Sequence, residues 1–231
     1  MLCYPGVQEY NMAHWAFRRL AGMLSREGFH VLRFDWSGTG DSWGETNDGT
    51  IETWLDDVAL AAQELRDASA ASSISIVGMR LGAALAALAC TQGVAAERLV
   101  LWEPVVSGSR YIAELEALHA RDSLRLLHPV PAHCAELVGF PFSPALRASV
   151  GQIDLCAKPP RSAGRVLIVA GAERPDHRAL YAALQSLGLI VSYECVPEDP
   201  SATNLGQRES ALLTTRSLVA IADHLAEKGT S

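Results

Sequence analysis

Residues 74–84, with the sequence Ile-Ser-Ile-Val-Gly-Met-Arg-Leu-Gly-Ala-Ala, decide the fold of this chain. The β-branched residues at the start of the stretch predict a short buried strand, and the Ala- and Leu-rich residues 81–92 predict a helix. Arg80 lies at the centre of the turn between them, flanked by Gly78 and Gly82. Glycines at these positions let the strand and the helix approach closely. The stretch therefore predicts a strand, a sharp turn and a helix, with a permanent cation at the turn.

The same alternation of strands and helices continues on both sides of this stretch. Runs rich in β-formers, bounded by turn residues, predict strands at residues 2–4, 29–35, 98–102, 165–170 and 189–196. Helical spacing of apolar residues predicts helices at residues 10–26, 50–70, 176–187 and 207–227. Alternating strands and helices indicate an α/β fold, in which helices cover both faces of a mostly parallel sheet in a three-layer, doubly wound arrangement.

Residues 105–162 interrupt this alternation. They contain helical pieces, such as residues 110–127, which are broken by several prolines. We therefore predict a core formed by residues 1–104 and 163–231 and an insertion formed by residues 105–162.

The composition excludes several classes of protein. The chain has 231 residues, which suffices for one α/β domain with a large core, and a net charge of −7, which argues against nucleic acid as a partner. No apolar run is long enough to span a membrane, and no signal peptide is apparent at the start. The five cysteines form no C-x-x-C pair, so we expect reduced thiols in a cytoplasmic protein.

Three segments carry a resemblance to a known family: residues 3–14, residues 34–42, and residues 78–82 followed by 101–106. Together they resemble the α/β-hydrolase superfamily, close to its serine-aminopeptidase-like branch. The turn at Arg80 is similar to the nucleophile elbow of that superfamily, G-x-S-x-G. With Arg in place of Ser, it resembles a subgroup of hydrolase-like proteins that includes those associated with exosortase and exopolysaccharide gene clusters. The resemblance implies that the insertion 105–162 forms a cap over the site.

The catalytic triad that the resemblance implies is degenerate. Arg80 takes the place of the serine, and a guanidinium cannot act as a nucleophile. Counting from Gly171, the acid position falls on Arg174, with Glu173 and Asp176 beside it. The histidine is expected after the last strand, but residues 197–205 contain none. An ordinary Ser-His-Asp mechanism is therefore not expected.

The residues around the turn are the candidate ligand-binding site. An oxyanion hole could persist, formed by the backbone N–H groups of Leu81 and of Gly6 or Val7. Arg80 either pairs with a carboxylate, with Glu9 as the first candidate and Glu103 as the second, or binds an anion. The two glutamates could instead serve as general bases acting on water. The full set of candidate site residues is Gly6, Val7, Glu9, Trp36, Met79, Arg80, Leu81, Trp102 and Glu103.

The histidines and the start of the chain allow further expectations. The spacing of His119, His128 and His133 is not that of a metal site, so neither a metal nor a cofactor is expected. His177 could approach the site from the acid side. Relative to the superfamily, the first two strands of the sheet are missing, which would leave the strand at 29–34 at an edge. We expect a second copy or a partner chain to cover that edge, or the natural chain to begin upstream.

Three functions remain open from the sequence. The first is a non-catalytic or atypical member of the superfamily that binds a small anionic or acyl-type ligand, or that serves as an accessory protein of a biosynthetic cluster. The second is an active esterase, thioesterase or peptidase with relocated catalytic groups. The third is a structural partner that assembles through the exposed sheet edge.

Overall fold

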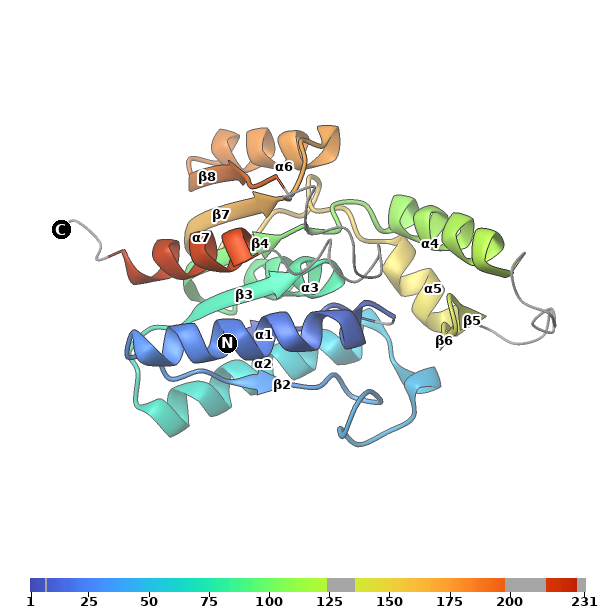
Figure 1. The fold of residues 1–231 in the computed structure, drawn as a ribbon, viewed down its shortest axis with the longest axis horizontal. Helices are drawn as coiled ribbons and strands as arrows, with labels where there is room; N and C mark the ends of the chain where they lie inside the picture. Colours follow the sequence, from blue (N-terminus) through green and yellow to red (C-terminus); the bar gives the residue numbers. More distant parts are fainter. Residues whose placement is uncertain (7, 124–135, 198–214, 228–231) are drawn as a thin grey trace.

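The computed structural model describes residues 1–6, 8–123, 136–197 and 215–227. Its centre is a sheet of 6 strands in the order β2-β1-β3-β4-β7-β8, and every neighbouring pair is parallel (Figure 1). The strands are β1 (Leu2–Cys3), β2 (Arg33–Phe34), β3 (Ser75–Met79), β4 (Ala96–Trp102), β7 (Ala163–Ala170) and β8 (Ile190–Cys195). The predicted mostly parallel α/β sheet is confirmed.

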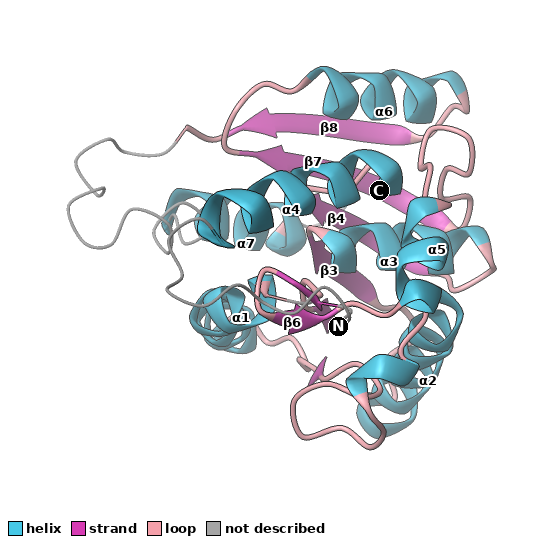
Figure 2. Cartoon of the chain, turned by 90° about the vertical axis from the view of Figure 1, so that its right-hand side faces the viewer, coloured by secondary structure: helices cyan, strands magenta, loops and turns pink. Residues whose placement is uncertain are grey.

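Helices cover both faces of the sheet, because both sides of its central strands are apolar. Along β3, Ile76 packs into one hydrophobic cluster, whereas Val77 and Met79 pack into the other. One face carries α1 (Glu9–Arg26) and α7 (Thr215–Ala226), and the other carries α2 (Ile51–Ser69), α3 (Leu81–Thr91) and α6 (Pro175–Ser186). Figure 2 shows α1 and α7 on one side of the sheet and α2 and α3 on the other. The three-layer arrangement is therefore confirmed.

The turn between β3 and α3 brings backbone atoms into contact that only glycines permit. Arg80 adopts a positive φ of 52° at this turn. A Cβ on Gly78 would lie 2.4 Å from the carbonyl oxygen of Gly82, and a Cβ on Gly82 would lie 2.2 Å from that of Tyr4. Both glycines are therefore fixed by the crossing of α3 over the ends of β1 and β3.

The insertion after β4 lies beyond the carboxyl ends of the strands (Figure 1). It contains α4 (Gly108–Ser123), the short antiparallel pair β5 (Glu136–Leu137) and β6 (Phe140–Pro141), and α5 (Pro144–Gly151). Leu115 and Leu146 belong to the same hydrophobic cluster as α2 and α3. The insertion is thus packed onto the core. The boundaries 105 and 162 stay a prediction.

Two predicted elements differ from the structure. The strand expected at 29–35 is limited to Arg33 and Phe34, because β1 offers only Leu2 and Cys3 for pairing. A short 3₁₀ helix at Thr46–Asp48 occupies part of the predicted loop before α2. The helix expected at 207–227 is described from Thr215 onward, and residues 207–214 lie outside the described part.

The position of β2 agrees with the expected sheet edge. In the described part of the chain β2 pairs with β1 alone and ends the sheet. That a second copy or a partner chain covers this edge stays a prediction. Within the same residues, no helix is long and apolar enough to cross a membrane.

We expect Gly82→Ala to destabilise the protein by about 3 kcal/mol or more, because the added Cβ meets the backbone of Tyr4 and cannot be relieved by side-chain rotation. Gly22→Ala, in α1, is the matched control. Its Cβ meets nothing within 4 Å, and the change should stabilise the helix by about 1 kcal/mol. Urea unfolding of both variants checks this, and equal stabilities would contradict it.

Candidate functional site

Arg80 lies at the carboxyl end of β3 and caps the N-terminus of α3. Its backbone N–H donates to the carbonyl of Trp102 at 2.9 Å, and its own carbonyl accepts from the N–H of Val105 at 3.2 Å. These bonds tie the turn to the end of β4 and to the start of the insertion. The Arg80 side chain is 13% exposed, so its charge needs a partner within the protein.

Glu9, the first of the two candidates that the sequence offered, is that partner. Its Oε1 accepts from Arg80 Nε at 2.8 Å, and its Oε2 accepts from the hydroxyl of Tyr111 at 3.0 Å. Glu9 is the first residue of α1, where a carboxylate is favoured by the helix dipole. Tyr111, from α4, also places its ring 5.5 Å from the guanidinium carbon of Arg80. Three elements of the chain thus converge on the turn.

The titration of Arg80 and Tyr111 reflects this pairing. Burial is the largest single influence on the pKa of Arg80 and lowers it, but the charge and hydrogen bond of Glu9, together with Tyr111 and the charge of Glu114, outweigh burial, and the pKa is raised. Burial and the charge of Glu9 raise the pKa of Tyr111 well above its usual range. Arg80 therefore remains a cation, and Tyr111 remains a neutral donor.

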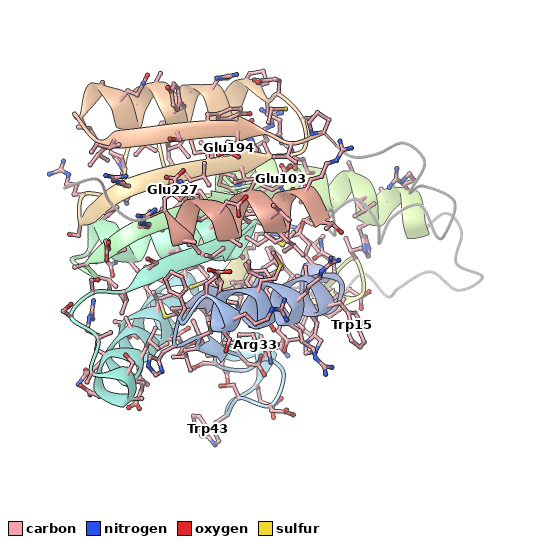
Figure 3. All side chains as sticks on the ribbon, turned by 60° about the vertical axis from the view of Figure 1, so that its left-hand side comes forward. Trp15, Arg33, Trp43, Glu103, Glu194 and Glu227 are labelled. Atoms are coloured by element: carbon pink, nitrogen blue, oxygen red, sulfur yellow. The ribbon has the colours of Figure 1, made fainter. Side chains whose placement is uncertain are left out.

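Glu103 meets Arg80 differently from the way the sequence suggested. Its backbone carbonyl, not its carboxylate, lies 3.4 Å from Arg80 Nη1. Its carboxylate accepts a hydrogen bond from the N–H of Gly171, after β7. Glu103 is labelled in Figure 3. Glu103 also has a positive φ of 47°. Glu103, the second candidate partner, thus meets Arg80 through its backbone carbonyl. Its side chain instead ties β4 to the loop after β7.

A second carboxylate, that of Glu114 in α4, connects Arg80 to two further arginines, Arg174 and Arg110. Glu114 Oε2 lies 3.6 Å from Arg80 Nη2, and its Oε1 lies 2.9 Å from Arg174 Nη2 and 3.4 Å from Arg110 Nε. Arg174 and Arg110 also pair with Asp176, at 3.4 Å and 3.6 Å. Arg174, at the position implied for the triad acid, therefore belongs to the same network as Arg80.

Sequence reasoning missed Tyr111, Glu114 and Arg110. Within the predicted helix 110–127, Glu114 lies three residues after Tyr111 and four after Arg110, which is a signal that it neighbours both. The sequence does not show that these residues meet Arg80.

The remaining predicted site residues are mostly core residues. Met79, Leu81, Trp36 and Trp102 are buried, and Trp36 donates its indole N–H to the carbonyl of Tyr4 at 3.1 Å. The structure therefore places the two tryptophans in the hydrophobic core, which the sequence had left open. Gly6 packs against Leu81, because a Cβ on Gly6 would lie 2.9 Å from Leu81 Cδ2. Val7 lies outside the described residues.

The histidines and cysteines form no metal-binding group within the described residues. His119 accepts a hydrogen bond from the N–H of Val138, and His128 and His133 lie outside the described part. His177 is fully buried, with Nε2 3.1 Å from the carbonyl oxygen of Pro104, so Nε2 carries the proton. Its Nδ1 has no hydrogen-bond partner within the part of the chain that the structure describes.

Comparisons with known proteins agree with this architecture. A family model described as serine aminopeptidase, S33, matches residues 6–183. An esterase from Pyrococcus furiosus aligns with a TM-score of 0.61 at 16% identity, over 97% of this chain and 79% of its own. A proline iminopeptidase-related protein from Thermus thermophilus gives 0.60 at 18%, over 97% and 88%. Est1E from Butyrivibrio proteoclasticus, with ferulic acid bound, gives 0.56 at 16%, over 98% and 84%. No curated protein matches the chain.

We expect Glu9→Gln to destabilise the protein by about 3 kcal/mol, because it leaves the buried cation of Arg80 without its nearest counter-charge. Glu116→Gln is the matched control. Glu116 pairs with Arg147 where both side chains are largely exposed, so its loss should cost at most about 0.5 kcal/mol. Chemical unfolding measures both, and an equal loss in the two variants would contradict the assigned role of Glu9.

We expect the buried ring of His177 to make stability fall in mild acid. Burial lowers its pKa below the ordinary value of 6.5, against the opposing charges of Glu103 and Asp176. Below that value the unfolded chain binds a proton that the folded chain does not, so this contribution is complete above pH 6.5 and is lost as the pH falls. In His177→Gln, the decline in unfolding free energy from about pH 7 to about pH 5 should be shallower. If the unfolding free energy depends on pH in the same way in His177→Gln and in the wild type, this role of His177 is wrong.

Proposed function

Because the chain belongs to the serine aminopeptidase S33 family of the α/β-hydrolase superfamily, we propose that it is a member that does not hydrolyse its ligand. It binds a small anionic or acyl-type molecule at the Arg80 turn, beside the insertion that follows β4. The observation that carries the proposal is the ion pair between Arg80 and Glu9 at the place where the family's nucleophile is expected.

Three features support the absence of triad chemistry. The guanidinium of Arg80 stays protonated at ordinary pH and has no free lone pair with which to attack a substrate. The acid position holds Arg174, and residues 197–205 contain no histidine. His177 does not replace it, since its Nε2 donates to the carbonyl of Pro104. The nucleophile and the base of a triad are thus both missing from the positions that the family implies for them.

A hydrolase that uses a glutamate-activated water is less well supported. Glu9 already accepts hydrogen bonds from Arg80 and Tyr111, one on each oxygen. Each oxygen therefore already has a donor of the protein against it, and a water molecule would have to compete with that donor. The carboxylate of Glu103 is held by the N–H of Gly171. Neither glutamate is positioned as a free general base.

Ligand binding is supported by the electrostatics of the turn. The first N–H groups of a helix have no intrahelical acceptors, and the helix dipole adds positive potential at that end. At the N-terminus of α3 the side chain of Arg80 adds a full positive charge. A carboxylate, a phosphate or the carbonyl oxygen of an acyl group is stabilised by that combination.

A serine-directed fluorophosphonate probe should leave the purified protein unlabelled, and p-nitrophenyl acetate should not be hydrolysed above the rate in buffer. The reason is that no side chain at the turn can form a covalent intermediate. Arg80→Ser, which restores the hydroxyl without a histidine base, should stay inactive. Turnover by the wild type that disappears in a folded Glu9→Gln variant would replace this proposal with a glutamate-based hydrolase.

A further inference from the structure

Glu114 holds a position that a bound ligand would be expected to hold. Its two carboxylate oxygens lie against different guanidinium groups: Oε2 is 3.6 Å from Arg80 Nη2, and Oε1 is 2.9 Å from Arg174 Nη2. Arg110 approaches Oε1 at 3.4 Å as a third cation. A carboxylate that bridges two arginines is a common mode of anion recognition. Here the bridging carboxylate comes from the protein itself.

The two bridged arginines belong to the core of the fold. Arg80 is fixed at the turn after β3, and Arg174 caps the N-terminus of α6. Glu114 comes from α4, in the insertion beyond the carboxyl ends of the strands (Figure 1). The two cations are therefore positioned independently of the anion between them, so the anion can leave without dismantling the sheet.

The charges of this cluster balance only while Glu114 is present. Three arginines, Arg80, Arg110 and Arg174, face three carboxylates, and Glu9 and Asp176 supply the other two negative charges. Withdrawing Glu114 leaves one uncompensated positive charge between Arg80 and Arg174. A single negative charge restores neutrality, whereas a doubly charged phosphate would leave an excess beside Glu9 and Asp176.

The position of Glu114 is also open to exchange. Its side chain is 38% exposed, that of Arg174 is 27% exposed, and that of Arg80 is 13% exposed. The cluster thus runs from solvent at Glu114 to the buried turn at Arg80. An ion pair with this exposure contributes little stability, so displacing it costs little.

We propose that Glu114 is an internal competitor for the ligand site, and that a small-molecule monocarboxylate displaces it and bridges Arg80 and Arg174. This inference rests on the proposed function, since it assigns the ligand class and a second recognition residue to the Arg80 site. It also assigns a role to Arg174, which stands at the position implied for the triad acid.

Binding of propionate to the wild type, Glu114→Ala and Glu116→Ala tests the proposal. Isothermal titration calorimetry at constant ionic strength, with chloride as the balancing ion, keeps screening equal among the samples. We expect propionate to bind Glu114→Ala up to about five-fold more tightly than the wild type, because the competitor is gone. Glu116→Ala, on the same helix but paired with Arg147, should match the wild type. Glu114→Gln removes the charge with little change in size, and should shift the affinity in the same direction if the alanine variant fails to fold.

Two further binding measurements test the class of ligand and the location of the site. Inorganic phosphate should bind Glu114→Ala more weakly than propionate does, and the double variant Glu114→Ala/Arg174→Gln should lose the gain. Equal propionate affinity in Glu114→Ala and the wild type would overturn the proposal, as would tighter binding of phosphate or a gain that survives the loss of Arg174. None of these outcomes depends on ester turnover, so none of them contradicts the proposal that the protein is not a hydrolase. That proposal fails separately, if the wild type hydrolyses esters.

Discussion

The ion pair between Arg80 and Glu9 is the constraint on which the rest of this site depends. A guanidinium at a buried turn, next to a helix N-terminus that already carries positive potential, is unfavourable without a counter-charge. Glu9 supplies that charge from the first turn of α1, and Tyr111 supplies the donor that completes the carboxylate's coordination. The start of α1, the turn after β3 and helix α4 are held together by one buried charge and its partners.

The turn after β3 combines the close backbone packing of the fold with a cluster of charged side chains. The two glycines of the turn are kept because α3 crosses the ends of β1 and β3 at backbone contact distance. That constraint concerns packing and does not depend on the residue between the glycines. Two arginines, Arg80 at the turn and Arg174 at the start of α6, both reach Glu114. The turn after β3 thus presents two guanidinium groups to one carboxylate of the insertion.

The differences between prediction and structure have local causes. The strand expected at 29–35 has the right composition, but its length is set by the two residues of β1 with which it pairs. Glu103 was the second candidate partner of Arg80; it has a positive φ, its carbonyl meets Arg80, and its side chain meets Gly171. Backbone pairing and backbone rotation at single residues are not visible in residue type.

The sequence by itself determined the parallel α/β architecture, the strand-turn-helix at Arg80, and the need of a buried Arg80 for an anion, with Glu9 as the first of two candidate partners. Those features follow from periodicity, from paired glycines and from the need of a buried cation for an anion, all of which are properties of residues near one another in the chain or of charge alone. Only the tertiary structure decided that Tyr111, Glu114 and Arg174 complete the site. They come from α4 and from the start of α6, and which side chains of those elements meet at the turn depends on how the insertion packs over the carboxyl ends of the strands.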